Sequence, residues 1–144
     1  MPPSLTVTTE VSVRFNEADP LGIVWHGHYI RYFEDGREAF GAKYGLTYLD
    51  FYQNGLVVPI VSVDCQFKKP LRYGDSVIVE ARYSDAPAAK IQFEYRLLHA
   101  RTGDLVATGS STQVFLNKDD MTLLWTVPDF FSKWKKRWLN EIPG

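Results

Sequence analysis

The sequence predicts an α+β fold in which a five-stranded antiparallel sheet packs against one long helix, with a second helix at the C-terminus. Three observations lead to this prediction. Five segments alternate apolar and polar residues, which is typical of half-buried strands. Segment 27–44 instead spaces its aromatic residues along one stripe of a helix. Short turns join most of the later strands, which favours antiparallel pairing and a two-layer arrangement.

Composition indicates a single domain spanning residues 1–144. A chain of 144 residues can bury a core without disulfides, and 45% hydrophobic with 23% charged residues is ordinary for a globular protein. The formal net charge of −1 gives no reason to expect nucleic acid or a membrane surface as a partner. The residues also give no reason to expect a cofactor.

The cysteine content and the N-terminus favour a cytoplasmic protein. Cys65 is the only cysteine, so an intrachain disulfide cannot form and a reducing compartment is expected. The first residues lack the basic and apolar regions of a signal peptide, and no apolar run is long enough to span a bilayer. No acid–base partner pattern surrounds Cys65, which is therefore interpreted as a small core residue and not as a nucleophile.

The first strand is predicted over Leu5–Phe15, where apolar residues recur at every second position. Pro20 and Gly22 then end regular pairing. A helix is predicted over 27–44, and Gly45 directly after it supplies a left-handed stop. Gly36 lies on the apolar stripe of this helix, and we interpret it as a point where the helix closely approaches the sheet.

The rest of the chain is predicted to form four strands and a helix. Residues 46–54 make a packed connection, and residues 68–75 make a basic turn. The last segment, 128–139, is an amphipathic helix whose aromatic residues share one face. The four strands are predicted over 57–67, 76–83, 90–100 and 105–116.

Chemistry-bearing residues gather where the first strand breaks and the long helix begins. A carboxylate beside a helix N-terminus could act as a nucleophile or general base, since the helix supplies backbone N–H donors and a positive dipole end. Asp19 has this position. Taken alone, Asp19-Pro20 also fits an ordinary turn, because this pair favours turns.

The surrounding residues favour the catalytic interpretation. Residues 19–29 read Asp-Pro-Leu-Gly-Ile-Val-Trp-His-Gly-His-Tyr, and residues 32–37 read Tyr-Phe-Glu-Asp-Gly-Arg. These two stretches resemble the 4-hydroxybenzoyl-CoA thioesterase family of the hot-dog fold, including its YbgC-like acyl-CoA thioesterases. The resemblance is strongest over residues 11–44 and continues more loosely through residues 67–75. It implies a sheet wrapped around the long helix, and hydrolysis of an acyl- or aroyl-CoA.

The resemblance also implies site residues. Asp19 matches the family's catalytic carboxylate, which acts as nucleophile or general base. The backbone N–H of His26 matches an oxyanion donor, with Gly27 next to it, and the His26 side chain matches an assisting histidine of the YbgC-like branch. Glu34 matches the family's helix glutamate, and Arg37 is at a spacing that allows a pair with it. Tyr29 is included in this positioning set, although burial as the first core residue of the helix is the better explanation for it.

Coenzyme A carries phosphates, so basic residues are expected at the mouth of a thioesterase pocket. Lys68, Lys69 and Arg72 form one group of candidates, and Lys90 is another. Taken one at a time, each of these residues also fits an exposed turn charge without a ligand. An acyl-carrier protein could present the acyl group in place of coenzyme A.

A metal site is the alternative interpretation of the histidines. His26 and His28 are spaced so that two imidazoles could bind zinc, but a catalytic zinc site usually has a third protein ligand. His99 lies on a distant predicted strand, and no cluster of Cys or Glu accompanies the pair. No metal is therefore expected.

An open sheet leaves two strand edges, which proteins usually pair or cover. Members of the resembled family join two sheets edge to edge, with active sites at the dimer interface. We therefore expect a homodimer or homotetramer.

Two other functions stay open from the sequence. A hot-dog dehydratase or hydratase would use Asp19 and His26 as an acid–base pair. A non-catalytic module would bind an acyl-CoA or an acyl-carrier protein without hydrolysing it. Release of free thiol separates the thioesterase from both alternatives, and fold alone cannot do so.

Overall fold

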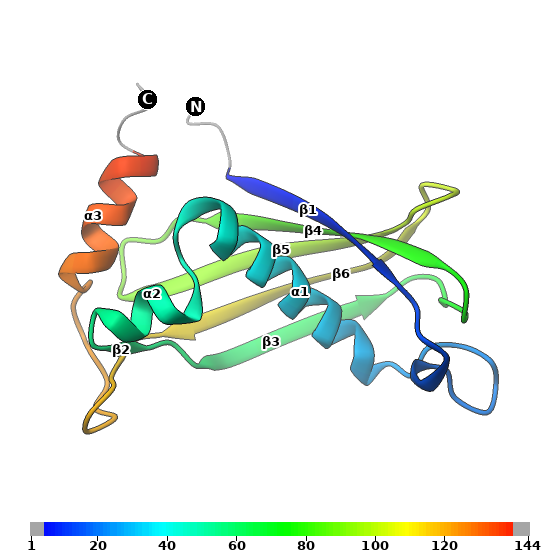
Figure 1. Cartoon of the computed structure of the whole chain (residues 1–144), viewed down its shortest axis with the longest axis horizontal. Helices are drawn as coiled ribbons and strands as arrows, with labels where there is room; N and C mark the ends of the chain where they lie inside the picture. The colour runs from blue at the N-terminus through cyan, green and yellow to red at the C-terminus, as the bar shows by residue number, and fades with distance from the viewer. Residues whose placement is uncertain (1–4, 140–144) are drawn as a thin grey trace.

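The computed structural model describes residues 5–139 and has the predicted α+β architecture (Figure 1). Five strands form one antiparallel sheet in the order β1-β4-β5-β6-β3. Strand β3 lies at an edge of this sheet and pairs with β6. It does not pair with β4, the next strand in the chain. The strands are β1 Thr6–Ser12, β3 Ile60–Phe67, β4 Ser76–Ser84, β5 Lys90–His99 and β6 Leu105–Val114.

The long helix α1, Gly27–Tyr44, has the predicted bounds and lies across one face of the sheet (Figure 1). Gly45 ends it in the left-handed conformation, with φ +78°, and donates its N–H to the carbonyl of Gly41. The close approach predicted at Gly36 is confirmed, because a Cβ there would lie 2.8 Å from Cγ1 of Val79 on β4. The absence of a side chain thus lets α1 settle onto the sheet.

Three predicted strand bounds are wrong, each for a local reason. Strand β1 stops at Ser12, because the chain turns into the 3-10 helix η1, Phe15–Glu17. The predicted strand 57–67 is divided at Pro59, which has no N–H to give to a sheet ladder. Strand β6 stops at Val114, after which β7, Leu116–Asn117, pairs with β2, Leu56–Val57, in a separate two-stranded sheet.

The connection after α1 is a short helix that the sequence interpretation did not predict. This helix, α2, spans Tyr48–Gln53. Thr47 caps it, since its Oγ1 accepts the N–H of Asp50 at 3.1 Å and its own N–H donates to the Asp50 carboxylate at 2.8 Å.

The C-terminal helix α3, Asp129–Trp138, covers one end of the space between α1 and the sheet (Figure 1). Phe131 and Trp134 are buried, and the indole N–H of Trp134 donates to the carbonyl of Tyr44 at 2.7 Å. Loop 13–26, which precedes α1, lies at the opposite end of the molecule (Figure 1). None of the helices within residues 5–139 is long and apolar enough to cross a membrane.

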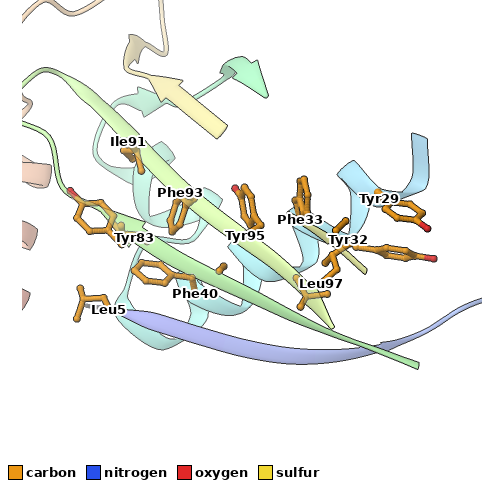
Figure 2. Packing of buried hydrophobic residues seen from close by; sticks show 14 of the residues in the cluster. Leu5, Tyr29, Tyr32, Phe33, Phe40, Tyr83, Ile91, Phe93, Tyr95 and Leu97 are labelled. Atoms are coloured by element: carbon orange, nitrogen blue, oxygen red, sulfur yellow. The ribbon is translucent and has the colours of Figure 1, made fainter. Parts of the chain in front are cut away.

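The core between α1 and the sheet is rich in aromatic side chains (Figure 2). Phe33 stacks on Tyr95 with ring centroids 4.4 Å apart, and Phe40 meets Phe93 edge to face at 4.9 Å. Offset-stacked and edge-to-face contacts are the favourable arrangements for such rings. These ring contacts fix α1 against the sheet, and so fix the position of the helix N-terminus that follows loop 13–26.

Candidate active site

Loop 13–26 folds back on itself as an irregular hairpin. Asp19 donates its N–H to the carbonyl of Ile23 at 2.8 Å, and Ala18 forms a β-bridge with Val24. Gly22 has φ +82°, a conformation that a residue with a side chain rarely adopts, and its N–H donates to the carbonyl of Asp19 at 2.9 Å. The predicted break after the first strand is therefore a defined turn.

The Asp19 carboxylate is partly exposed, and one of its oxygens holds the turn. Its Oδ1 accepts the N–H of Leu21 at 2.8 Å. Within residues 5–139, the second oxygen, Oδ2, has no hydrogen-bond or ion-pair partner. Asp19 thus combines the turn role with a carboxylate oxygen that is free to meet a ligand.

Two backbone amides where α1 begins, those of His26 and Gly27, are also free among the residues that the structure describes. His28 donates its N–H to Trp25 at 3.0 Å, and Tyr29 donates to His26 at 3.2 Å. The amides of His26 and Gly27 have no acceptor in the described part of the chain. Unpaired amides at a helix N-terminus, together with the helix dipole, favour an anion or a carbonyl oxygen that gains negative charge.

A cavity of about 310 Å³ brings most of the predicted residues together. The basic turn supplies one wall, and the loop and the start of α1 supply the other. Lys68 and Lys69 thereby line the same cavity as Asp19, although they lie about 50 residues further along the chain. The lining residues are Asp19, Ile23, Val24, His26, Tyr29, Phe67, Lys68, Lys69 and Pro70.

Tyr29 is buried and joins the two walls. Its hydroxyl donates to the carbonyl of Lys69 at 3.3 Å, and its ring meets Phe67 with centroids 5.1 Å apart. Burial raises the pKa of the Tyr29 hydroxyl, so the group keeps its proton and remains a donor. Tyr29 thus positions the basic turn against α1.

The His26 side chain is exposed at the mouth of the cavity. Its ring lies between the ring of Trp25, at a centroid distance of 4.9 Å, and that of Phe67, at 6.2 Å. The indole of Trp25 also covers Gly27, because a Cβ on Gly27 would lie only 2.2 Å from the indole. Glycine at position 27 therefore leaves room for the indole beside the free amides.

Glu34 does not reach this cavity in the same chain. It lines a second cavity of about 530 Å³, together with Arg37 and residues of α2 and β2. The expected Glu34–Arg37 pair is absent from residues 5–139, because Arg37 donates to the hydroxyl of Tyr95 at 3.2 Å. The Tyr95 hydroxyl also forms a buried hydrogen bond with the hydroxyl of Ser111, with the two oxygens 2.6 Å apart. The Arg37 guanidinium is therefore directed at this buried polar pair and not at Glu34.

Of the four basic residues expected to bind coenzyme A, only Lys68 and Lys69 line the cavity. Arg72 lies next to the cavity through its β-bridge with Ile23, but it is not among the lining residues. Lys90 is at the far end of β5, opposite Val114 of β6, whereas Lys68 and Lys69 are bonded to Val106 at the near end. The structure therefore does not group Lys90 with the other three.

The sequence interpretation missed two residues that build this site. Phe67 forms an aromatic wall of the cavity, and its only signal was an aromatic residue directly before the basic turn. Glu17 is almost fully buried, at 2% exposure, two residues before Asp19. A carboxylate in a strand break gave no sign of burial, because acidic residues in turns are usually exposed.

We predict that metal removal leaves activity unchanged. His99 is directed at Asp75, with Nε2 3.3 Å from Oδ1, and its Nδ1 accepts the N–H of Arg101 at 3.2 Å. Residues 5–139 contain no group of three His, Cys, Asp or Glu side chains suited to a metal ion. Thiol release should therefore be the same before and after treatment with a chelator. Loss of turnover that zinc restores would instead make His26 and His28 ligands.

Comparison with known proteins identifies the class to which this chain belongs. The chain belongs to the thioesterase-like superfamily, whose family model matches residues 13–135. Its fold is similar to that of a 4-hydroxybenzoyl-CoA thioesterase variant in complex with 4-hydroxybenzoyl-CoA, with a TM-score of 0.77 and 23% identity over 90% of this chain and 98% of that one. The predicted hot-dog fold is thereby confirmed.

Two curated relatives cover most of the chain. The protein named "Putative acyl-CoA thioesterase YneP" from Bacillus subtilis is 28% identical over 130 residues, which cover 88% of this chain and 94% of the relative. The 1,4-dihydroxy-2-naphthoyl-CoA hydrolase of Thermosynechococcus vestitus is 28% identical over 126 residues, which cover 87% and 85% of the two chains.

Proposed function

We propose that this protein is an acyl-CoA thioesterase that hydrolyses an acyl- or aroyl-CoA to the free acid and coenzyme A. One observation carries the proposal. Asp19, which has a free carboxylate oxygen, and His26, whose amide has no acceptor in the described residues, line the same cavity together with two lysines. Gly27, whose amide also has no acceptor there, follows His26 directly. The names of the relatives support the same substrate class, since they cite acyl-CoA and aroyl-CoA thioesters.

In this proposal each group has a distinct task. The amides of His26 and Gly27 donate to the thioester carbonyl oxygen as it gains negative charge. Asp19 either attacks the carbonyl carbon or takes a proton from an attacking water. If Asp19 attacks, the C–S bond breaks to leave an anhydride on Asp19, and a water then hydrolyses this anhydride to the free acid and restores the carboxylate. If water attacks, the C–S bond breaks and the free acid forms directly. In both routes the coenzyme A thiolate leaves and takes up a proton that the water supplies, directly or through Asp19, to give the free thiol. The exposed ring of His26 stands at the mouth of the cavity, where it could hold water or steady the carboxylate.

Lys68 and Lys69 are proposed to receive the coenzyme A phosphates. Both lie at the cavity, and both are held by backbone bonds to the carbonyl of Val106, Lys68 at 2.8 Å and Lys69 at 3.1 Å. The ammonium group of Lys69 is 3.2 Å from the Asp104 carboxylate in an exposed pair. Such pairs contribute little free energy, so a phosphate can compete for the lysine. Arg72 lies close enough to extend the same basic surface.

The experiment is a thiol-release screen across short, long, branched and aromatic acyl-CoAs, with an acyl-carrier protein substrate included. Rapid release from one class identifies the acyl group and the carrier together. Binding of acyl-CoA without release would indicate the non-catalytic module, and formation or loss of water at the α and β carbons would indicate a dehydratase or hydratase.

We also propose that the protein is at least a homodimer, joined along β3. This strand is an edge of the sheet and exposes Val61 to 59% and Phe67 to 52%, whereas the other edge, β1, exposes polar residues. Phe67 also lines the cavity, so a partner at this edge would complete the site. Sedimentation at micromolar concentration should give a dimer or a tetramer. A monomer would count against the composite site.

A further inference from the structure

The buried carboxylate of Glu17 is the feature of the site that hydrolysis itself does not use. Both of its oxygens are engaged. Oε1 accepts the N–H of Arg14 at 2.7 Å and the hydroxyl of Tyr32 at 3.0 Å, and Oε2 forms an ion pair with the guanidinium of Arg31. A carboxylate at 2% exposure is costly unless it is paired in this way.

The partners of Glu17 belong to different parts of the site. Arg14 lies at the start of the loop that carries Asp19, whereas Arg31 and Tyr32 lie on α1, one turn beyond its free amides. Tyr32 is fully buried, and burial raises the pKa of its hydroxyl to about 12, so it donates at any ordinary pH. The side chain of Glu17 therefore ties the loop to the helix.

The backbone of Glu17 closes the same loop at its base. Its carbonyl accepts the N–H of Trp25 at 3.1 Å, and its own N–H donates to the carbonyl of Arg14 at 3.0 Å. Asp19 follows Glu17 by two residues, and His26 follows Trp25 directly. Glu17 thus contacts three parts of the site: the segment that leads to Asp19, the segment that leads to His26, and the helix α1.

We propose that Glu17 is a positioning residue that sets the distance between the Asp19 carboxylate and the amides of His26 and Gly27, acting through Tyr32 and Arg31. The proposal rests on the proposed thioesterase function for its kinetic consequences. Glu17 touches no reacting atom, because its buried carboxylate contacts its own three partners, Arg14, Tyr32 and Arg31. Substitution of Glu17 should lower kcat, because the Asp19 carboxylate and the amides of His26 and Gly27 act together only when the distance between them is correct.

Two substitutions test the link. Glu17→Gln keeps the size but places NH₂ donors where Arg31 or Tyr32 also donates, so the loop and the helix should separate slightly. A misplacement of about 1 Å can cost on the order of 10²-fold in rate, and this is the loss of kcat expected for Glu17→Gln. Tyr32→Phe removes only one donor and should lower kcat by about tenfold, with KM within about threefold of wild type, because the lysines that hold coenzyme A are untouched.

Tyr83→Phe is the matched control. It also removes a tyrosine hydroxyl that donates to a carboxylate, here Asp85 at 2.9 Å, but Tyr83 and Tyr32 lie at opposite ends of the aromatic cluster (Figure 2). It should leave kcat and KM unchanged. Tyr32→Phe also keeps the test valid if Glu17→Gln does not fold, because it retains the packed ring and the buried carboxylate.

The readout that does not depend on activity is the amide spectrum. In ¹H–¹⁵N correlation spectra of the full chain, the signals of Asp19, His26 and Gly27 should move in Tyr32→Phe and Glu17→Gln, and should stay in place in Tyr83→Phe. Unmoved amide signals in a folded Tyr32→Phe protein overturn the proposal, as does an unchanged kcat in an active enzyme. If wild type releases no thiol from any acyl-CoA, the proposed function fails, and the amide signals still decide whether Glu17 positions the site.

Discussion

Asp19→Asn is expected to lower the turnover of an acyl-CoA substrate by about 10²- to 10⁴-fold, the usual span for loss of a nucleophile or general base. The substitution removes the charge of a carboxylate that lines the cavity. It keeps an acceptor for the N–H of Leu21, the 2.8 Å bond that holds the turn. Binding of acyl-CoA should largely survive, since Lys68 and Lys69 are unchanged, and the thermal midpoint should hardly move.

The measurement is a pair, the rate of thiol release and the thermal midpoint. Asp120→Asn is the matched control, because Asp120 holds a turn in the same way, accepting the N–H of Thr122 at 3.0 Å, and it is not among the residues that line the cavity. It should leave turnover at the wild-type level. Asp19→Ala should lose as much activity as Asp19→Asn, with a further cost of about 1 kcal/mol because the turn hydrogen bond is gone.

A simple turn role for Asp19 predicts the opposite pattern. Turnover of Asp19→Asn would then stay within about threefold of wild type, far from the loss expected for a catalytic base. Glu34 would become the next carboxylate to test. Because it lines a different cavity in the same chain, its participation would require that a second copy bring it to the site.

Phe40→Ala should destabilise the fold by about 3–5 kcal/mol, which is a large part of the 5–15 kcal/mol that usually holds a domain together. Phe40 has 0% exposure, and its ring lies within 6.2 Å, centroid to centroid, of the rings of Tyr44, Tyr83, Phe93 and Trp134. Truncation removes the contact that joins α1 to both the sheet and α3, and it leaves a cavity that so many rigid rings cannot close.

Denaturant unfolding measures this effect, and both proteins should be compared at the same concentration because oligomer dissociation adds to the apparent stability. Phe15→Ala is the control, since Phe15 is 77% exposed and its deletion should cost less than about 1 kcal/mol. A loss of similar size in the two variants would show that the aromatic cluster is not the principal core.

The sequence by itself determined most of the local elements, although it did not predict the short helix α2. The helix α1 begins and ends where the sequence predicted, since Gly27 and Gly45 mark its limits and the aromatic stripe between them has helical spacing. The strands followed from alternation, and their bounds were wrong by more than one residue only where the chain left the sheet, at Ser12, Pro59 and Val114. The resemblance of residues 19–37 also led to the loop that borders the cavity. Each of these signals is local, because caps, turns and side-chain periodicity depend on neighbouring residues.

Only the tertiary structure decided which distant residues meet. Strand order placed β3 beside β6, which brought Phe67, Lys68 and Lys69 to the Asp19 loop and left Lys90 at the far end of the sheet. The same packing buried Glu17 against Tyr32 and turned Arg37 from Glu34 to Tyr95. Local pattern does not encode these contacts, because they depend on the pairing order of strands and on which polar groups find partners when the helix closes over the sheet.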